Sequence, residues 1–316
     1  MNDPVQADLP LVHVLLAVYN GERHLPAQLA SLAAQTGVRV RLHVADDGSS
    51  DASVAIVRAF DAWPVVWHAR HPRGGASANF LNLICQVAPA MGPDEWLSLC
   101  DQDDIWHADK LARAVAALRG LPSELPAAYG ARTLAVDAGD RPLGPSFLAQ
   151  RPTGFANALV QCFMGGNTLV FNAAAAALLA RGGFADSGVI AHDWLAYQLI
   201  TGAGGRFVYD PEPCLRYRQH GDNAVGSNRG WRAKALRLRS LAAGDYREWN
   251  GRNIATLQSI RSVLTPENAG RFDAFVRARS ARWPWQRLAA LARSGVYRQR
   301  ALQTAALWLA CLAGKL

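Results

Sequence analysis

Over the first 110 residues, short apolar runs alternate with stretches whose apolar residues recur at helical spacing. The run Leu11–Val18 (LVHVLLAV) stops at a polar turn, which is typical of a buried strand. Helices of about ten residues between such strands predict βαβ units and a mainly parallel sheet. We expect strands at Leu11–Val18, Val38–Ala45, Pro64–His68 and Glu95–Cys100, and helices at Leu25–Ala34, Ala52–Phe60 and Ala76–Ala88.

The pattern is less regular past residue 110, where Pro122–Pro152 is rich in Pro and Gly and predicts loops around one short strand. From Trp231 onward the periodicity is helical and amphipathic, with Pro266 and Pro284 as breaks. We expect helices at Lys110–Leu118, Ala173–Ala180 and Asp193–Ile200, and strands near Tyr129–Val136, Gly165–Phe171, Arg206–Tyr209 and Leu215–His220.

Three of the predicted strands end in polar, turn-forming residues. The sequences that follow or close these strands are YNG (19–21), DDG (46–48) and DQDD (101–104). In parallel α/β sheets, ligands bind beyond the carboxyl ends of the strands. We therefore expect these three polar endings to line one edge of the sheet and to form the functional site.

Composition limits the class of protein. The chain has 316 residues, of which 50% are hydrophobic and 18% charged, enough for one large domain or one domain with an appendage. The five cysteines are scattered without a CxxC pair, so neither a disulfide framework nor a zinc site is indicated. We expect a cytoplasmic protein, because the first residues lack the features of a secretion signal and no run of 18 uncharged apolar residues occurs.

The net charge of +8 is unevenly distributed along the chain. Residues 229–316 hold 17 of the 33 Lys and Arg but only 4 of the 25 Asp and Glu, a net charge of +13, so the rest carries −5. We expect a catalytic domain over residues 1–228 and a basic amphipathic helical region over residues 229–316. Aromatic residues are interleaved with the basic ones, which suits an anionic membrane surface or a nucleic acid. They are Trp231, Trp249, Trp283, Trp285, Tyr297 and Trp308.

The acidic strand ending has two physical interpretations. Asp101, Asp103 and Asp104 cannot all be buried as free anions, because an unpaired buried carboxylate costs several kcal/mol or protonates. They are either solvated turn residues or ligands of a hard divalent cation. Mg²⁺ or Mn²⁺ held by one or two carboxylates keeps coordination positions open for substrate phosphates.

The motifs AVYNGE (17–22), ADDGSSD (45–51) and CDQDDIWHADKL (100–111) resemble, in order and spacing, those of family 2 glycosyltransferases. The resemblance covers roughly residues 10–225, about two-thirds of the chain. DQDDIW and YRQHGDN (217–223) are similar to the rhamnosyltransferase-like branch, and the Gln-x-x-Arg-Trp motif of processive members is absent. The resemblance implies an α/β GT-A fold, a mixed sheet flanked by helices, here followed by a C-terminal helical extension.

The resemblance also implies roles for individual residues. The base and ribose of a nucleotide-sugar donor would contact the first strand end and Asp47, with Asp46 the less favoured of the aspartate pair. Asp103 would bind Mg²⁺ or Mn²⁺, and Asp101 would lie nearer the donor's sugar or ribose. Arg73 and Asn79, near the glycines of HPRGG (71–75), are donor contacts if that segment is more than a surface turn. The donor-binding residues expected are Ala17, Tyr19, Glu22, Asp47, Arg73, Asn79 and Asp101.

Asp193 is the expected catalytic base. Transfer with inversion needs a group that takes the proton from the acceptor hydroxyl, and family members carry an acid at the start of the corresponding helix. Here His192 stands where a Glu is expected, and we assign it an orienting or packing role. An aspartate that opens a helix is also a normal cap, which is the alternative interpretation.

Two residues after the catalytic region remain as candidates. His220 is either a further metal ligand, a diphosphate contact or a structural histidine, and Arg218 is a candidate diphosphate contact.

The sequence thus favours an inverting, metal-dependent glycosyltransferase that uses a nucleoside-diphosphate sugar, with dTDP-rhamnose as one candidate. Its acceptor would be a cell-surface polysaccharide or lipid-linked glycan. The tail would touch the inner face of the cytoplasmic membrane, or else pack on the catalytic domain. A nucleotidyltransferase is an alternative, but YNGERHL after the first strand is no glycine-rich phosphate loop. The second alternative is a nucleic-acid-binding protein, although the acidic strand ends of this chain would repel a polyanion.

Overall fold

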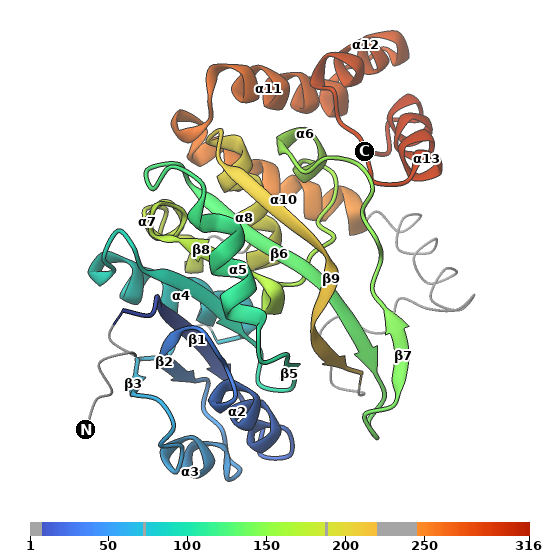
Figure 1. The fold of residues 1–316 in the computed structure, drawn as a ribbon. Coiled ribbons are helices and arrows are strands. Elements are labelled where there is room, and N and C mark those ends of the chain that lie inside the picture. Colours follow the sequence, from blue (N-terminus) through green and yellow to red (C-terminus); the bar gives the residue numbers. More distant parts are fainter. Residues whose placement is uncertain (1–7, 72–73, 187–188, 220–244) are drawn as a thin grey trace.

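The computed structural model describes residues 8–71, 74–186, 189–219 and 245–316 (Figure 1). In this part of the chain, nine strands form one mixed sheet with the order β3-β2-β1-β4-β8-β6-β9-β5, and β7 pairs with β6. The N-terminal strands, β3 to β4, are parallel to one another, whereas β8 runs antiparallel to β4. The site expected from the sequence therefore belongs to the parallel half of the sheet.

The parallel half follows the sequence prediction closely. β1 pairs with β2 from Leu11 opposite Arg39 to Val18 opposite Asp46, so both strands end at the same level. The strands are β1 (Leu11–Val18), β2 (Arg39–Asp46), β3 (Val65–Trp67) and β4 (Trp96–Cys100). The helices are α2 (Leu25–Ala33), α3 (Ser53–Arg58), α4 (Ala76–Val87) and α5 (Lys110–Arg119).

The second half of the sheet departs from the prediction of a mainly parallel sheet. It consists of β5 (Ile105–Trp106), β6 (Ala127–Val136), β7 (Pro142–Pro145), β8 (Val170–Asn172) and β9 (Arg206–Arg218). β8 lies antiparallel between β4 and β6, and β5 is antiparallel to β9. Only β6 and β9 pair in parallel here. Hydrophobic periodicity reports burial but not strand direction, so it did not show that this half is largely antiparallel, whereas the resemblance to the GT-A fold implied the mixed sheet that is observed.

Three predicted strands in this half are corrected. Most of Gly165–Phe171 is a 3₁₀ turn (Gly166–Thr168), and the strand begins only at Val170. The strands predicted separately at Arg206–Tyr209 and Leu215–His220 form one continuous strand, β9, that ends at Arg218, and His220 lies outside the described residues. Its pairing with β6 shifts register after Asp210, so that Pro213 lies opposite Arg132. A bulge of this kind accommodates prolines that a regular ladder would exclude.

Helices cover both faces of the sheet. α4, α7 (Ala173–Ala180) and α8 (His192–Gly202) bury Phe80, Leu178 and Leu199 against one face. α2, α3 and α5 bury Leu29 and Val57, together with Leu111 and Val115, against the other. Such a three-layer core is what alternating strands and helices produce.

The C-terminal helices form a separate group, with a core of their own, at one end of this three-layer body (Figure 1). They are α10 (Asp245–Ser259), α11 (Pro266–Ser280), α12 (Pro284–Ser294) and α13 (Ala301–Leu312). Their cluster includes Phe272, Leu291 and Cys311, and it joins Phe155 of the short helix α6 (Phe155–Ala158). This part of the tail therefore packs on the body. The predicted boundary between residues 228 and 229 lies outside the described residues.

The two prolines predicted as breaks, Pro266 and Pro284, each stand in the first turn of a helix, α11 and α12. Proline is tolerated there because its missing N–H would have no helical partner. A bilayer would need a longer apolar helix than any found in the described parts of the chain.

A row of histidines crosses the parallel strands diagonally, from near the amino end of β1 to the residue after β3. The Nδ1 atom of His13 on β1 lies 2.9 Å from Nε2 of His43 on β2, whose Nδ1 lies 2.8 Å from Nε2 of His68 after β3. The row ends at Glu95 Oε2, 2.9 Å from His13, and at Gln86 Oε1, 3.2 Å from His68. Burial, the neighbouring His13 and His68, and Arg41 lower the pKa of His43 to about 3.

Candidate active site

The predicted strand endings do meet at one edge of the sheet. The backbone N–H of Tyr19, after β1, donates to Oε1 of Gln102, after β4, at 2.9 Å, and Gln102 Nε2 donates back to the Tyr19 carbonyl at 2.9 Å. The N–H of Asp47, after β2, donates to the Val18 carbonyl at 2.7 Å. We call this the strand-end edge, formed by the residues that follow or close β1, β2 and β4: 19–22, 46–51 and 101–104.

The first two strand endings are fastened to each other by side chains. The N–H of Asn20 donates to Ser49 Oγ at 2.9 Å, and the N–H of Ser50 donates to Asn20 Oδ1 at 2.8 Å. The exposed Glu22 accepts from the N–H of Ala52 at 2.9 Å, just before α3 begins. The motifs therefore build a preformed, rigid rim, and the Glu22 carboxylate has a capping role in it.

The two adjacent aspartates after β2 face different partners. Asp46 Oδ2 accepts from the N–H groups of Gly48 at 3.1 Å and Ser49 at 3.0 Å, and so closes its own turn. Asp47 Oδ2 accepts from the N–H of Gly75 at 2.6 Å. Its buried Oδ1 has no hydrogen bond to any described residue and lies 3.9 Å from Arg70 Nη1. Asp47 thus keeps acceptor capacity at the strand-end edge that Asp46 lacks.

The other predicted donor contacts lie at different depths. Tyr19 is 56% exposed at the rim, and Ala17 is half-buried near the end of β1. Asn79 is buried on α4, where its Nδ2 donates to the Ala45 carbonyl at 3.2 Å. Asn79 therefore ties α4 to β2, and the structure gives its side chain no open surface. Arg73 lies outside the described residues.

The acidic ending of β4 divides into an inner and an outer part. Asp104 is fully buried, and its Oδ2 accepts from Asn167 Nδ2 at 2.6 Å, while Oδ1 has no hydrogen-bond partner among the described residues. Burial, then the charges of Asp101 and Asp103, raise the pKa of Asp104 well above its usual value. Asp101 and Asp103 are only half-buried and form the outer part. The inner aspartate has a structural role and the outer pair faces the edge.

A buried lysine lies beneath this acidic loop. Lys110, the first residue of α5, is fully buried, with Nζ 3.2 Å from Ser98 Oγ and 3.3 Å from the centre of the Trp106 ring. Burial lowers the pKa of Lys110 to about 8, against the opposing effect of nearby thiols and carboxylates that include Asp104. Sequence reasoning assigned no role to Lys110 or Asn167, although Lys110 belongs to the third motif.

The predicted base, Asp193, is distant in sequence from the acidic loop after β4 but lies near it in the fold. Asp193 lies in the first turn of α8, where its Oδ1 accepts from the N–H of Trp194 at 2.6 Å. Burial raises the pKa of Asp193, while His192 and the N–H groups of Trp194 and Gly166 oppose the rise. Burial, followed by the charges of Asp103 and Asp193, also raises the pKa of Asp101 to about 7. The fold thus brings Asp193 close enough to Asp101 for their charges to interact.

His192 packs between α4 and α8. Its ring lies 4.6 Å from the Phe80 ring, and its Nδ1 lies 3.3 Å from Ser77 Oγ. Burial lowers the pKa of His192, so the ring is neutral at pH 7. A Cβ atom on Gly166 would overlap with His192 Nε2, so the glycine lets the turn before β8 approach the start of α8. These contacts agree with an orienting or packing role for His192.

Arg218 brings a positive charge to the acidic loop. It is the last residue of β9 and is buried, with Nη1 3.1 Å from His24 Nδ1 and 3.4 Å from the carbonyl oxygen of Asp103. Strand β9 therefore carries Arg218 from the antiparallel half of the sheet to the strand-end edge. His220, two residues further on, lies outside the described residues.

The charges at this edge fit a divalent cation. In the described part of the chain, no group of three or more His, Cys, Asp or Glu is arranged to hold a metal. Nevertheless, Asp103 and Asp193 lie near enough to raise the pKa of Asp101, and Asp101 and Asp103 lie near enough to raise the pKa of Asp104. The surplus of negative charge in a partly buried site is costly, and a cation held by one carboxylate and by substrate phosphates would offset it.

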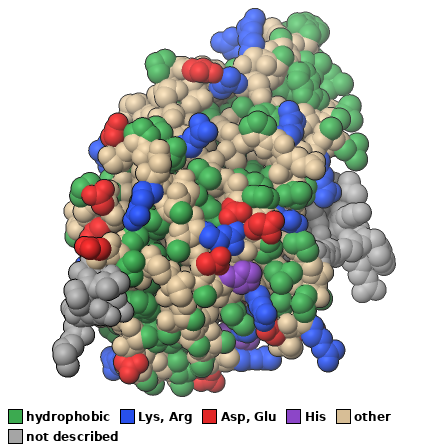
Figure 2. Space-filling view, in the orientation of Figure 1, with side chains coloured by type: hydrophobic (Ala, Val, Ile, Leu, Met, Phe, Trp, Pro, Cys, Tyr) green, Lys and Arg blue, Asp and Glu red, His purple; other side chains and the backbone are tan. Residues whose placement is uncertain are grey.

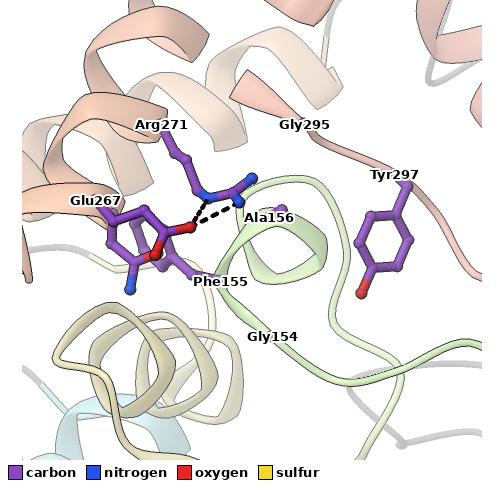
Figure 3. Close-up of a pocket in the computed structure, with 8 residues that line it drawn as sticks. Gly154, Phe155, Ala156, Glu267, Arg271, Gly295 and Tyr297 are labelled. Atoms are coloured by element: carbon purple, nitrogen blue, oxygen red, sulfur yellow. Dashed lines mark hydrogen bonds and ion pairs between the residues drawn. The ribbon is translucent and has the colours of Figure 1, made fainter. Parts of the chain in front are cut away.

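A separate cavity of about 290 Å³ lies between α6 and the C-terminal helices (Figure 3). Glu267 and Arg271 of α11 form an ion pair on one side, and Tyr297 stands on the other. The cavity contains none of the residues predicted for the site. It belongs to the junction between the C-terminal helices and the body.

Comparison with known proteins agrees with this geometry. Residues 13–133, which hold β1 to β4 and the whole strand-end edge, match the family described as Glycosyl transferase family 2. The dTDP-rhamnosyl transferase RfbG of Shigella flexneri is 27% identical over 245 residues, 74% of this chain and 81% of that protein. The succinoglycan biosynthesis protein ExoO of Rhizobium meliloti is 32% identical over 119 residues, 36% of this chain and 32% of ExoO.

The fold also has solved counterparts. The mannosyltransferase PcManGT from Pyrobaculum calidifontis, solved with GDP-Man and Mn²⁺, superimposes with a TM-score of 0.52 at 21% identity. The match covers 97% of this chain and 86% of that protein. The shared arrangement is the GT-A fold, a mixed sheet with flanking helices, as expected from the sequence.

Proposed function

Because the chain carries a family 2 glycosyltransferase domain, we propose that it transfers a sugar from a nucleoside-diphosphate sugar to a glycan acceptor, with inversion at the anomeric carbon. One observation carries this proposal. Asp101 and Asp103 after β4 and Asp193 at the start of α8, some 90 residues apart in sequence, converge at the strand-end edge. A single displacement step needs the donor and the base side by side in space.

On the donor side, Asp47, Tyr19, Ala17 and Glu22 would bind the base and ribose, with Arg73 and Asn79 beside them. Support comes from Asp47 Oδ1, which accepts no hydrogen bond from any described residue, and from the exposed ring of Tyr19. The burial of Asn79 and the capping hydrogen bond of Glu22 make these two the residues with most to rearrange on binding.

On the phosphate side, Asp103 and His220 would hold Mg²⁺ or Mn²⁺, with Asp101 near the donor's sugar or ribose. When bound, the cation would offset the negative charge that develops on the departing diphosphate. Arg218 supplies a second positive charge, and its contact with the Asp103 carbonyl favours a diphosphate contact beside the metal ligand.

On the acceptor side, Asp193 would accept the proton of the attacking hydroxyl. The acceptor oxygen forms its bond to the anomeric carbon, the bond from that carbon to the diphosphate oxygen breaks, and the proton passes to the carboxylate. The burial that raises the pKa of Asp193 makes it a better base than an exposed aspartate.

We propose rhamnose as the sugar. The relative RfbG is described as a dTDP-rhamnosyl transferase and aligns over most of both chains. We propose a cell-surface polysaccharide or a lipid-linked glycan as acceptor, in keeping with the name of ExoO. Such acceptors are built at the inner face of the cytoplasmic membrane, where we place the protein as a peripheral enzyme.

A thermal-shift panel tests the donor and the metal together. UDP-, GDP- and dTDP-sugars are added with and without Mn²⁺, and the fitting donor should raise the melting temperature in a metal-dependent way. Asp103→Ala should abolish the metal-dependent part of the shift. Asp61→Ala, which removes an exposed carboxylate before β3, is the matched control and should leave the shift intact. Absence of any shift with every donor would contradict the proposed function.

A further inference from the structure

Helix α13 exposes an apolar face. Leu302 is 83% exposed, Leu309 67% and Leu312 44%, while Leu307 and Cys311 on the opposite face are buried in the C-terminal core. Positions separated by seven and ten residues share a face of a helix. No charged residue occurs between residues 301 and 314. A surface helix usually presents charged or polar side chains to water, whereas the most exposed large side chains of α13 are leucines, and its polar Gln303 and Thr304 are only partly exposed.

Two tryptophans extend the apolar surface at the start of α12. Trp283 is 45% exposed and Trp285 63%, and their rings stack with centres 5.0 Å apart and planes 14° apart. Arg282 lies over the Trp283 ring at 5.2 Å. α12 packs against α13, and hydrophobic side chains gather at this end of the molecule (Figures 1 and 2). We call the exposed side chains of these two helices the C-terminal face: Trp283, Trp285, Leu302, Leu309 and Leu312.

The charge along the sequence that forms this face has a single sign. Residues 274–316 contain eight Lys and Arg and no Asp or Glu. Arg282 and Arg293 of this set are exposed beside or on α12. A second copy of the chain would bring the same positive charge to the contact, and repulsion would oppose its docking. A nucleic acid would be attracted by the positive charge, but the exposed leucines would contribute nothing to its binding.

We propose that the C-terminal face binds an anionic lipid bilayer, with α12 and α13 lying in the plane of the interface. Leucines enter the boundary between headgroups and acyl chains, tryptophans lie at headgroup level, and the arginines pair with acidic headgroups. With twelve residues, α13 lies on the membrane and does not cross it. This inference rests on the proposed function. It adds the surface through which the enzyme would reach an acceptor that is held at a membrane.

Vesicle co-sedimentation tests the proposal with the full chain. Protein should sediment with phosphatidylcholine vesicles that contain phosphatidylglycerol, and salt should weaken the binding. Leu302→Gln with Leu309→Gln should lower the affinity for these vesicles about tenfold or more. Both side chains are exposed, so the melting temperature should not change. The matched control is Leu143→Gln with Leu148→Gln, two leucines that are 45% and 39% exposed outside this face, and it should bind as the parent does.

Three outcomes would overturn the proposal. The parent chain fails to sediment with anionic vesicles, the α13 double variant binds them as well as the parent, or the control pair loses binding equally. Analytical ultracentrifugation tests the alternative, that a second copy of the chain covers the C-terminal face. If the parent is a dimer and the α13 double variant a monomer, the face joins two copies. Donor binding measured without vesicles reports on the strand-end edge alone, so failure of either proposal is recognised separately.

Discussion

The strand-end edge and the C-terminal face depart from the usual distribution of side chains in opposite directions. At the edge, charged groups are withdrawn from water, and Asp104 and Lys110 are fully buried. On the face, leucines and tryptophans are left in water, and Leu302 is the most exposed of them. Both arrangements cost stability, since buried charge and exposed apolar surface are each unfavourable. The comparison agrees with our two proposals, in which a bound ligand offsets each cost, a donor with its cation at the edge and a bilayer at the face.

The largest expected effect tests the role of the edge in catalysis. Asp193→Asn keeps the shape of the residue at the start of α8 but removes the base. We expect donor binding to persist and the rate of sugar transfer to fall by about 10²–10⁴-fold. Donor titration measures the binding, and initial-rate measurements on the same preparation measure the transfer. A variant that transfers sugar at the parent rate would show that Asp193 only caps α8.

The same residue sets an expectation for pH. Burial raises the pKa of Asp193, and only the carboxylate form accepts a proton. Activity should therefore fall as the pH drops through that raised pKa, at a higher pH than an exposed aspartate would give. Initial rates at saturating donor across the acidic range measure this.

The next effect tests whether the buried charges at the edge depend on one another. Lys110→Met keeps the length of the side chain but leaves the buried carboxylates nearby without its charge. We expect the free energy of unfolding in urea to fall by about 3–5 kcal/mol. Adding Asp104→Asn should recover part of the loss, because the second change removes the uncompensated anion. Arg58→Met, which changes an exposed side chain at the end of α3, is the control and should be nearly neutral.

The smallest effect is expected on the C-terminal face. Leu309→Ala should change the free energy of unfolding by less than about 0.5 kcal/mol, because its side chain is mostly in water. Leu291→Ala, in the buried core of the same helical region, should cost about 2–5 kcal/mol. Urea titrations of both variants measure the contrast. A large loss for Leu309→Ala would mean that this leucine packs within the protein.

The sequence predicted the parallel half of the fold because its signals are local. Leu11–Val18 is apolar along its length and stops at residues that form turns, so both the strand and its end could be located. The same reasoning placed Asp47 and Asp101 at one edge, which the pairing of β1 with β2 and β4 confirms. The antiparallel half depends on pairing between distant strands, as in the bulged ladder of β6 and β9, and no local pattern encodes that.

The site was predictable only in part for a similar reason. Asp193 was assigned through resemblance to a family, since nothing local distinguishes it from a helix cap. The burial of Lys110 was missed, because a lysine at the start of a helix is ordinarily solvated. Its pocket arises from Ser98 and Trp106, which are brought together by tertiary packing. The exposure of Leu302 was missed too, because an apolar helix predicts burial.

The histidine row that crosses β1, β2 and β3 fixes a count of protons. Four contacts link Glu95, His13, His43, His68 and Gln86, and each needs one hydrogen. Gln86 Nε2 is engaged with the Ala69 carbonyl at 3.1 Å, so Oε1 faces His68 and the row has an acceptor at each end. Three neutral imidazoles supply only three hydrogens. Filling every contact would take a fourth hydrogen, and burial and its neighbours lower the pKa of His43 to about 3, so the central ring is not the one that would carry it.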